Sequence, residues 1–327
     1  TYHIRPDYHL NIMKKGQTLN SITGTILQGL DPVLNKENPD MILVHGDTTT
    51  TFASALAAFY HKIPIGHVEA GLRTHNLYSP YPEEANRQMV SNIAELHFTP
   101  TMSSLKNLLQ ENKDPEKIFV TGNTAIDALK TTVKEEYDSP VLQWAGDSRI
   151  MLLTAHRREN QGEPLRRIFT AVNKITEKYP DVRVIYPCHM NPAVRGMAHE
   201  IFDGNGKVRL IEPLEVTDFH NLIKKSYLVL TDSGGIQEEG PSLGKPVLVV
   251  RETTERPEGV EAGTLKLVGT STERIVKEVS RLLDDKEEYE RMSTAENPYG
   301  DGNASKRIIN AILRYFQNRE IGIDIPA

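Results

Sequence analysis

The sequence predicts an α/β protein built from two doubly wound domains, and three observations support this class. Short apolar runs rich in β-branched residues recur along the chain, and each is followed by a polar or glycine-containing turn and then by a helix-like segment. The chain has 327 residues, more than one core usually serves, so we expect two domains of roughly 150 residues each. A polar, turn-forming connection over residues 137–149 divides the apolar runs into two groups.

The apolar runs are predicted to be parallel strands. In chain order they cover residues 41–47, 63–70, 96–100, 118–123, 150–156, 182–189, 208–213, 227–232 and 245–252. We therefore expect a Rossmann-like domain over 1–145, a second one over 146–302, and an amphipathic helix with a tail over 303–327 that packs on either half, including a return to the first domain. Ligands of open parallel sheets bind at the carboxyl ends of the strands, so two such domains facing each other would form a cleft for a ligand.

The composition of the chain excludes several classes of binding partner and cellular location. The net charge of −6 and the pI near 6.0 argue against nucleic acid or an anionic membrane as the main partner, so an anionic ligand must be held by local donors. Cys188 is the only cysteine, which excludes an intrachain disulfide and favours a reducing compartment. No apolar stretch approaches the roughly 18 residues that span a bilayer, and no leader pattern opens the sequence. We expect a cytoplasmic protein.

Acidic side chains follow the first two predicted strands. Asp47 comes after the run MILVHG and Glu69 after IPIGHV, so on strands about 4.8 Å apart both would project into one crevice. Two carboxylates held close together rarely both stay ionised, which suits one of them to general acid catalysis. The alternative is that Asp47 opens a threonine-capped turn and Glu69 pairs with Arg73. Glu83 follows a proline at a helix start, where the helix dipole alone favours an acid, and only proximity to Glu69 would give it a catalytic role.

Candidate phosphate ligands follow the strands of the second half. His189 ends the run VRVIYPCH and could donate to a phosphate, whereas His156 and Arg157 in AHRREN form either a phosphate clamp or a solvated basic loop. Residues 233–235, Ser-Gly-Gly, follow YLVLTD and either present amides to a diphosphate or make a tight turn. Glu239 lies about one helical turn further on and could accept from a ribose diol. The motif is neither G-x-G-x-x-G nor a P-loop, and no metal-ligand spacing is present, so we expect a nucleotide-diphosphate site without a metal.

Several motifs together closely resemble those of the bacterial non-hydrolysing UDP-N-acetylglucosamine 2-epimerases. They run in the family's order from about residue 40 to about residue 315 and read HGDTTTT, GHVEAGLRT, PEEANR, TGN, AHRREN, YPCHMNP, TDSGGIQEE, SLGKPVLV, TTERPE and NPYGDG. The resemblance implies the two-domain glycosyltransferase-B architecture, a homodimer, and interconversion of UDP-GlcNAc and UDP-ManNAc for cell-wall or capsule polysaccharides. It also implies that no metal or redox cofactor is used.

The resemblance assigns roles to individual residues. By motif, the acid/base carboxylates are Asp47, Glu69 and Glu83, and His189 serves the diphosphate and the leaving group. The nucleotide contacts implied are Ser233, Gly234 and Gly235 to the phosphates, Glu239 to the ribose, Phe219 to the uracil, and Arg256. Phe219 is alternatively a core residue, and Arg256 alternatively a partner of Glu255.

The sequence departs from the family pattern in two places. Family members usually begin with a strand and a Gly-Thr-Arg-Pro-Glu loop that contributes basic residues near the phosphates, and the printed sequence starts after that point. Either that segment is missing from the printed sequence, or a chain without it would be impaired in activity. Several relatives also bind a second UDP-GlcNAc as an allosteric activator through the early region. Gly16 stands before QTL where the family often has arginine, which removes a basic residue from that region.

The implied reaction explains why several carboxylates are needed. The proton at C2 of the sugar is not next to a carbonyl, so elimination of UDP to a 2-acetamidoglucal, followed by re-addition, avoids a direct deprotonation. One acid/base group on each face of the ring is then expected. Three other activities remain open at this point: a UDP-sugar glycosyltransferase of the same fold, a hydrolysing epimerase that releases free ManNAc, and a catalytically inactive protein that binds UDP-sugars.

Overall fold

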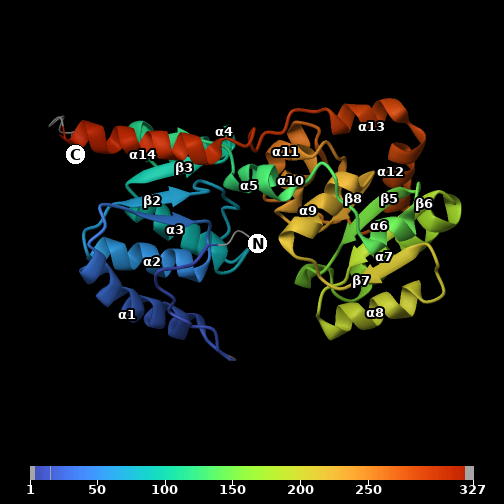
Figure 1. Ribbon diagram of the computed structural model, residues 1–327, viewed down its shortest axis with the longest axis horizontal. Helices are drawn as coiled ribbons and strands as arrows, with labels where there is room; N and C mark the ends of the chain where they lie inside the picture. Colours follow the sequence, from blue (N-terminus) through green and yellow to red (C-terminus); the bar gives the residue numbers. More distant parts are fainter. Residues whose placement is uncertain (1–3, 15, 321–327) are drawn as a thin grey trace. The chain divides into compact units, whose positions relative to one another are not determined.

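The structure is a computed structural model and describes residues 4–14 and 16–320. The described residues divide into two compact units, the first formed by those up to Thr124 together with those from Gly302 onward and the second by Ala125–Asp301. This division falls about twenty residues before the boundary that we predicted after 145. Helices α5 (Thr124–Thr132) and α6 (Pro140–Ala145), which lie on either side of the start of the polar segment 137–149, both pack into the core of the second unit. Figure 1 shows the path of the chain through both units.

The first unit is a parallel sheet with the strand order β1-β2-β3-β4. Its strands are β1 (Ile42–His45), β2 (Ile65–Val68), β3 (Leu96–Thr99) and β4 (Ile118–Val120). One core cluster joins this sheet to the first three helices, through side chains such as Val44, Ile65 and Val90. These helices are α1 (Leu19–Glu37), α2 (Thr49–Tyr60) and α3 (Glu83–Ile93), and they are followed by α4 (Met102–Gln110) and the 3₁₀ turn η1 (Pro115–Lys117).

The last helix returns to this first sheet. Helix α14 (Ala304–Glu320) buries Ile308, Ala311 and Tyr315 in one cluster with side chains of β2 and β3. Figure 1 shows it as the red helix that runs along the sheet of β1–β4. Of the two packing partners that the sequence left open for residues 303–327, the helix therefore packs on the first.

The second unit is a parallel sheet with the strand order β10-β9-β8-β5-β6-β7. Alternate residues of β5 enter different core clusters, with Met151 and Leu153 in one and Ile150 and Leu152 in the other, so both faces of this sheet are covered. The strands are β5 (Arg149–Thr154), β6 (Val182–Pro187), β7 (Val208–Ile211), β8 (Leu228–Thr231), β9 (Val247–Val249) and β10 (Leu265–Leu267). Besides α5 and α6, its helices are η2 (Arg158–Asn160), α7 (Glu163–Lys178), α8 (Pro192–Phe202), α9 (Val216–Lys225), α10 (Ile236–Ser242), α11 (Pro257–Glu261), α12 (Thr272–Asp284) and α13 (Lys286–Ser293).

The predicted α/β class with two parallel sheets is confirmed. Each of the nine predicted apolar runs contains a strand, and β10 is the one strand in the described part of the chain that the sequence did not indicate. The three residues of β10, Leu-Lys-Leu, are too few to show a period, and the strand lies at the edge of its sheet. Across the described residues, no helix combines the length and the apolar character that crossing a membrane requires.

Candidate functional site

Asp47 and Glu69 follow neighbouring strands, as their positions in the sequence predicted. His45 at the end of β1 lies in register with Val68 at the end of β2, and the amide of Gly46 donates to the carbonyl of Val68 (3.0 Å). Gly46 has a φ of +72°, and a Cβ there would stand 3.2 Å from Oε2 of Glu69, so glycine makes room for this carboxylate. Glu69 itself has a φ of +64°, a backbone conformation that glutamate seldom adopts and that tends to occur at functional positions.

Arg87 of α3 joins the two carboxylates. Its Nη2 donates to Oδ2 of Asp47 and to Oε2 of Glu69 (3.1 Å), and its Nη1 donates to the backbone carbonyl of Glu69. The arginine side chain is 6% exposed, whereas those of Asp47 and Glu69 are 29% and 14% exposed. One buried cation therefore holds two carboxylates that still reach solvent, and the three side chains carry a net charge of −1.

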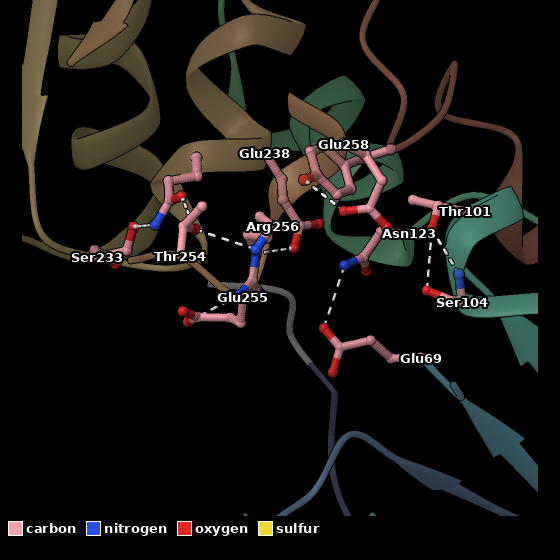
Figure 2. Close-up of polar contacts among 12 residues, drawn as sticks. Glu69, Thr101, Ser104, Asn123, Ser233, Glu238, Thr254, Glu255, Arg256 and Glu258 are labelled. Atoms are coloured by element: carbon pink, nitrogen blue, oxygen red, sulfur yellow. Dashed lines mark hydrogen bonds and ion pairs between the residues drawn. The ribbon is translucent and has the colours of Figure 1, made fainter. Parts of the chain in front are cut away.

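Two asparagines complete the support of these acids. Asn86 donates from Nδ2 to the carbonyl of Asp47 (2.9 Å), and Asn123 donates from Nδ2 to Oε1 of Glu69 (3.3 Å). Figure 2 shows the contact between Asn123 and Glu69. Arg73, which we considered as a partner for Glu69, donates instead to the two carboxylate oxygens of Glu111 (2.7 and 2.8 Å).

The two glutamates in the first turn of α3, Glu83 and Glu84, have different surroundings. Glu84 is 3% exposed and accepts from the backbone amides of Thr74 (2.9 Å) and His75 (3.2 Å), so it orders the preceding loop. Glu83 begins the helix and lies three and four residues before Asn86 and Arg87. Because residues at these spacings share one face of a helix, Glu83 lies on the face that contacts Asp47 and Glu69.

A buried histidine supports the loop behind the acids. His67 in β2 is fully buried, and its Nε2 lies 2.8 Å from the carbonyl of Gly46, so this nitrogen carries a proton and donates it. Burial, and after it the charge of Arg87, holds the pKa of His67 well below its ordinary value. The neutral ring thus fixes the carbonyl that directly precedes Asp47.

The Ser-Gly-Gly turn follows β8 and lies against Arg256. The amide of Ser233 donates to Oγ1 of Thr231 (2.9 Å), which leaves the next two amides, those of Gly234 and Gly235, without an acceptor within the described residues. A Cβ at Gly234 would come within 2.9 Å of both Nη1 of Arg256 and Oε1 of Glu255. Any side chain here would have to displace the ends of Arg256 and Glu255, so glycine lets this charged pair approach the turn closely.

Ion pairs connect the arginines around this turn. Arg256 donates from Nε to Glu238 (2.6 Å) and lies 3.1 Å from Glu255, as Figure 2 shows. Glu255 also accepts from Arg251 (2.6 Å) and from Arg157 (3.4 Å). Burial acts to raise the pKa of Glu255, but the guanidinium groups of Arg256, Arg251 and Arg157 outweigh it and lower this pKa to about 2.

Glu239 and Phe219 lie on helices that also belong to the second unit. Oε2 of Glu239 is 3.5 Å from Nε2 of His220, whose other ring nitrogen lies 2.7 Å from Oγ1 of Thr132. Phe219 of α9 is partly buried and packs against a core cluster, in agreement with its reading as a core residue. Neighbours of Phe219 on α9, Asp218 and Leu222, line a cavity of about 490 Å³. Contact of either predicted residue with a nucleotide remains a prediction.

The structure brings the two candidate histidines together. His189 follows β6, His156 follows β5, and their rings stack in parallel with centroids 5.0 Å apart. His156 also lies beside Asp232, the residue directly after β8, with 3.8 Å between Nδ1 and Oδ1. Cys188 is buried, and burial raises the pKa of its thiol, as expected for an inert cysteine.

Sequence reasoning missed four residues of these sites: Asn86, Arg87, Asn123 and Asp232. Asn86 and Arg87 stand in the quoted motif PEEANR, at helical spacing from Glu83, and that spacing was the available signal. Asn123 and Asp232 carry no such signal, because each meets its partner only where the fold brings strand ends together: Asn123 and Glu69 follow β4 and β2, which lie on either side of β3, and Asp232 and Asn160 follow the adjacent strands β8 and β5.

Comparisons with known proteins place these sites in a family. A family model described as UDP-N-acetylglucosamine 2-epimerase matches residues 1–313. The chain is 60% identical to the UDP-N-acetylglucosamine 2-epimerase of Bacillus subtilis over 319 residues, which are 98% of this chain and 84% of the relative. The chain belongs to the UDP-N-acetylglucosamine 2-epimerase family. Epimerases are isomerases, so the resemblance and the enzyme class that the motifs indicated are both confirmed.

Solved structures of family members have the same fold. The S. aureus MnaA–UDP co-structure matches with a TM-score of 0.92 and 54% identity, over 96% of this chain and 84% of the other. The UDP-GlcNAc 2-epimerase from Neisseria meningitidis bound to UDP-GlcNAc matches with a TM-score of 0.88 and 50% identity, over 95% of this chain and 86% of the other.

Proposed function

We propose that this epimerase interconverts UDP-GlcNAc and UDP-ManNAc by eliminating UDP and adding it back. The observation that carries the proposal is the convergence of Asp47 and Glu69 on one buried guanidinium at the carboxyl edge of a parallel sheet. Family membership supplies the substrate class, because relatives have been solved with UDP and with UDP-GlcNAc bound.

The elimination requires an acid/base group near C2 and a stabilised leaving group at C1. A carboxylate takes the C2 proton while the C1–O bond breaks and its electron pair leaves with UDP, which gives 2-acetamidoglucal and UDP. In the reverse direction UDP adds to C1 and an acid protonates C2 on the opposite face, so the configuration at C2 is inverted. Because the proton leaves one face of C2 and returns to the other, two acid/base groups on different structural elements suit this reaction better than one.

The first unit supplies the acid/base groups in this proposal. Asp47, Glu69 and Glu83 transfer the C2 proton, and their partial exposure leaves them able to reach a sugar. Arg87 and Asn123 hold the carboxylates of Asp47 and Glu69 in fixed orientations, which lowers the cost of aligning them with the substrate.

The second unit supplies the nucleotide contacts. The amides of Gly234 and Gly235, the hydroxyl of Ser233 and the guanidinium groups of Arg157 and Arg256 are placed around one turn and bind the diphosphate. Further contacts that we propose are His189 to the leaving phosphate, Glu239 to the ribose and Phe219 to the uracil. Charge grows on the departing phosphate, so donors that are fixed before the reaction stabilise the transition state most.

Incubation with UDP-GlcNAc in D₂O, followed at the sugar H2 by NMR, tests the proposal. We expect loss of the H2 signal and formation of UDP-ManNAc with the UDP linkage intact. Free ManNAc would show a hydrolysing epimerase, and release of UDP that depends on an added acceptor would show a glycosyltransferase. A bound but unchanged UDP-sugar would show a protein that only binds it, and each of these three results would overturn the proposal.

We further propose the family's assembly and setting for this chain: a homodimer, in the cytoplasm, whose product serves cell-wall or capsule polysaccharides. A solution mass of twice the 36.7 kDa chain is the expected result of light scattering. A second UDP-GlcNAc as an activator would contact the early region, where Gly16 has a φ of +72° and no side chain to offer. Initial rates measured against UDP-GlcNAc concentration test this, because activation by a second molecule gives a sigmoidal curve.

A further inference from the structure

Three adjacent strands of the second sheet end in one row of titratable side chains. In the order β8-β5-β6, Asp232 directly follows β8, His156 lies two residues after β5, and His189 lies two residues after β6. Because the carboxyl ends of neighbouring parallel strands meet at one edge, the three side chains lie side by side in that order. Only His189 has a role in the proposed reaction, which leaves Asp232 and His156 to be explained.

Asp232 is a buried carboxylate, and only one of its two oxygens accepts hydrogen bonds within the described residues. Its Oδ2 accepts from the backbone amides of His156 and Arg157 (2.8 Å each) and from Nδ2 of Asn160 (3.0 Å). The whole residue has zero exposure, and its Oδ1 has no hydrogen-bond partner within the described residues. A buried acceptor without a partner is costly, so such an atom calls for a functional reason. Nδ1 of His156 lies 3.8 Å from this oxygen.

His156, whose backbone amide Asp232 holds, stacks on the ring of His189. The two imidazole planes differ by only 6°, with centroids 5.0 Å apart, which is a stacked arrangement. Burial and the nearby charges of His189 and Arg157 lower the pKa of His156, and the charge of Asp232 opposes them. His156 is therefore neutral near pH 7, and a neutral ring can stack on His189 without charge repulsion.

The backbone sets the tautomer of His189. Its Nδ1 accepts a hydrogen bond from the amide of Asn191 (3.1 Å), so the proton of the neutral ring sits on Nε2. Nε2 is the ring nitrogen on the side away from that amide, and the residue is exposed. His189 can thus donate from Nε2 only while its ring keeps the plane that the Asn191 amide and the stacked His156 define.

We propose that His156, anchored by Asp232, is a positioning residue that fixes the imidazole plane of His189 and keeps its Nε2–H directed at the leaving phosphate. This inference rests on the role of His189 in the proposed function. His156 makes no contact with substrate in this account, and the one step involved is donation of a hydrogen bond, with no proton or group transferred by His156 itself.

Three variants of this protein separate this role from a structural one. His156→Ala removes the stack and the approach of the ring Nδ1 to Asp232, and His156→Phe keeps a stacked ring without that Nδ1, while the backbone bond from residue 156 to Asp232 stays in both. Asp232→Asn keeps the shape and most acceptor contacts without the charge. We expect kcat to fall about 10- to 100-fold in His156→Ala and by less in the other two, because a small misplacement of a donor is costly in the transition state. KM and the Kd for UDP should stay within about 2-fold of wild type.

The ¹⁵N spectrum of the imidazoles, recorded without substrate, provides a readout that a structural role would not move. In wild type, His189 should show the tautomer with its proton on Nε2. In His156→Ala the ring can turn away from the Asn191 amide because nothing stacks on it, so it should show a mixture of both tautomers at an unchanged melting temperature. His199→Ala, at an exposed position on α8, is the matched control and should match wild type throughout.

Two results would overturn the positioning role: wild-type kcat together with an unchanged His189 tautomer in His156→Ala and His156→Phe, or a parallel loss of kcat, UDP affinity and melting temperature in all three variants. A failure of the proposed function would look different from both of these results. In that case wild type itself shows no exchange at C2, while the tautomer measurement still reports on His156 and His189.

Discussion

The two charged regions of this protein are balanced differently. In the first unit, Asp47 and Glu69 both pair with the guanidinium of Arg87, and the three side chains together carry a formal charge of −1. In the second unit, three arginines around the Ser-Gly-Gly turn are paired with three glutamates, which leaves no net charge; the members are Arg157, Arg251, Arg256, Glu159, Glu238 and Glu255.

This difference suits the two tasks proposed for the regions. A carboxylate that transfers protons must stay partly exposed, as those of Asp47 and Glu69 do. Groups that bind a diphosphate must keep their positions before the ligand arrives, and a closed network of ion pairs achieves that. The comparison predicts that substitutions in the first region change the rate, whereas substitutions in the second change stability and binding.

The largest expected effect is on the rate, in Glu69→Gln and Asp47→Asn. Each removes an acid/base group but keeps its size, and we expect kcat for epimerisation to fall on the order of 10³-fold, with UDP binding still measurable by calorimetry. His189→Ala should also abolish epimerisation, through the leaving group. Glu95→Gln is the control, because Glu95 forms a surface ion pair with Lys117 (3.1 Å) in the same unit. Wild-type turnover in Glu69→Gln and Asp47→Asn would remove both carboxylates from the mechanism.

The next effect distinguishes the two units by their response to acid. His97 in β3 is 3% exposed, and burial, followed by the charges of Lys113 and Arg73, lowers its pKa to about 4. Because the unfolded chain binds this proton near pH 6.5 and the folded chain does not, the contribution of His97 is fully present above pH 6.5 and is lost towards pH 4. The loss amounts to about 3 kcal/mol.

His97→Leu should abolish this part of the acid sensitivity. Hydrogen exchange of β3 peptides between pH 7 and pH 4 measures it, with His199→Leu as the control on exposed α8. An identical decline of β3 protection in wild type and in His97→Leu would contradict the prediction.

A smaller effect is expected in the second unit, at lower pH. The pKa of Glu255 is lowered to about 2, so its stabilisation is present above its ordinary value of 4.5 and is lost as the pH falls from there towards 2. Since its side chain is 19% exposed, we expect about 2 kcal/mol from this source.

Urea unfolding of Glu255→Gln at several pH values tests this prediction. The variant should be less stable than wild type at pH 7, and the difference should shrink below pH 4.5. A deficit that stays constant with pH would mean that Glu255 stabilises the turn by packing and not by charge.

The smallest effect is expected in Arg87→Lys. Lysine keeps the charge, but a single ammonium cannot reach Asp47, Glu69 and the Glu69 carbonyl as the planar guanidinium does. We expect about a 10-fold lower kcat with little change in UDP affinity. Arg73→Lys, which alters the neighbouring ion pair with Glu111, is the comparison for stability alone. A larger loss of UDP affinity than of kcat would break the division of tasks between the two regions.

Local patterns in the amino-acid order were enough to establish the α/β class, the nine main strands and the residues at their carboxyl ends. These features depend on periodicity and on turn residues, which act over a few positions of the chain. The same local logic placed Asp47 beside Glu69, because adjacent parallel strands bring their ends together.

Long-range packing decided the rest. The contacts of Arg87 with Glu69 and Asp47 span 18 and 40 positions of the chain, and the contact of Asn160 with Asp232 spans 72, so no short window contains them. Glu83 and Glu84 look alike in the motif, yet burial assigns Glu84 to the preceding loop and leaves Glu83 on the face of Arg87. Long-range packing also explains why the boundary between the units lies at Thr124. Helices α5 and α6 are buried in the core of the second unit despite the polar character of the segment between them.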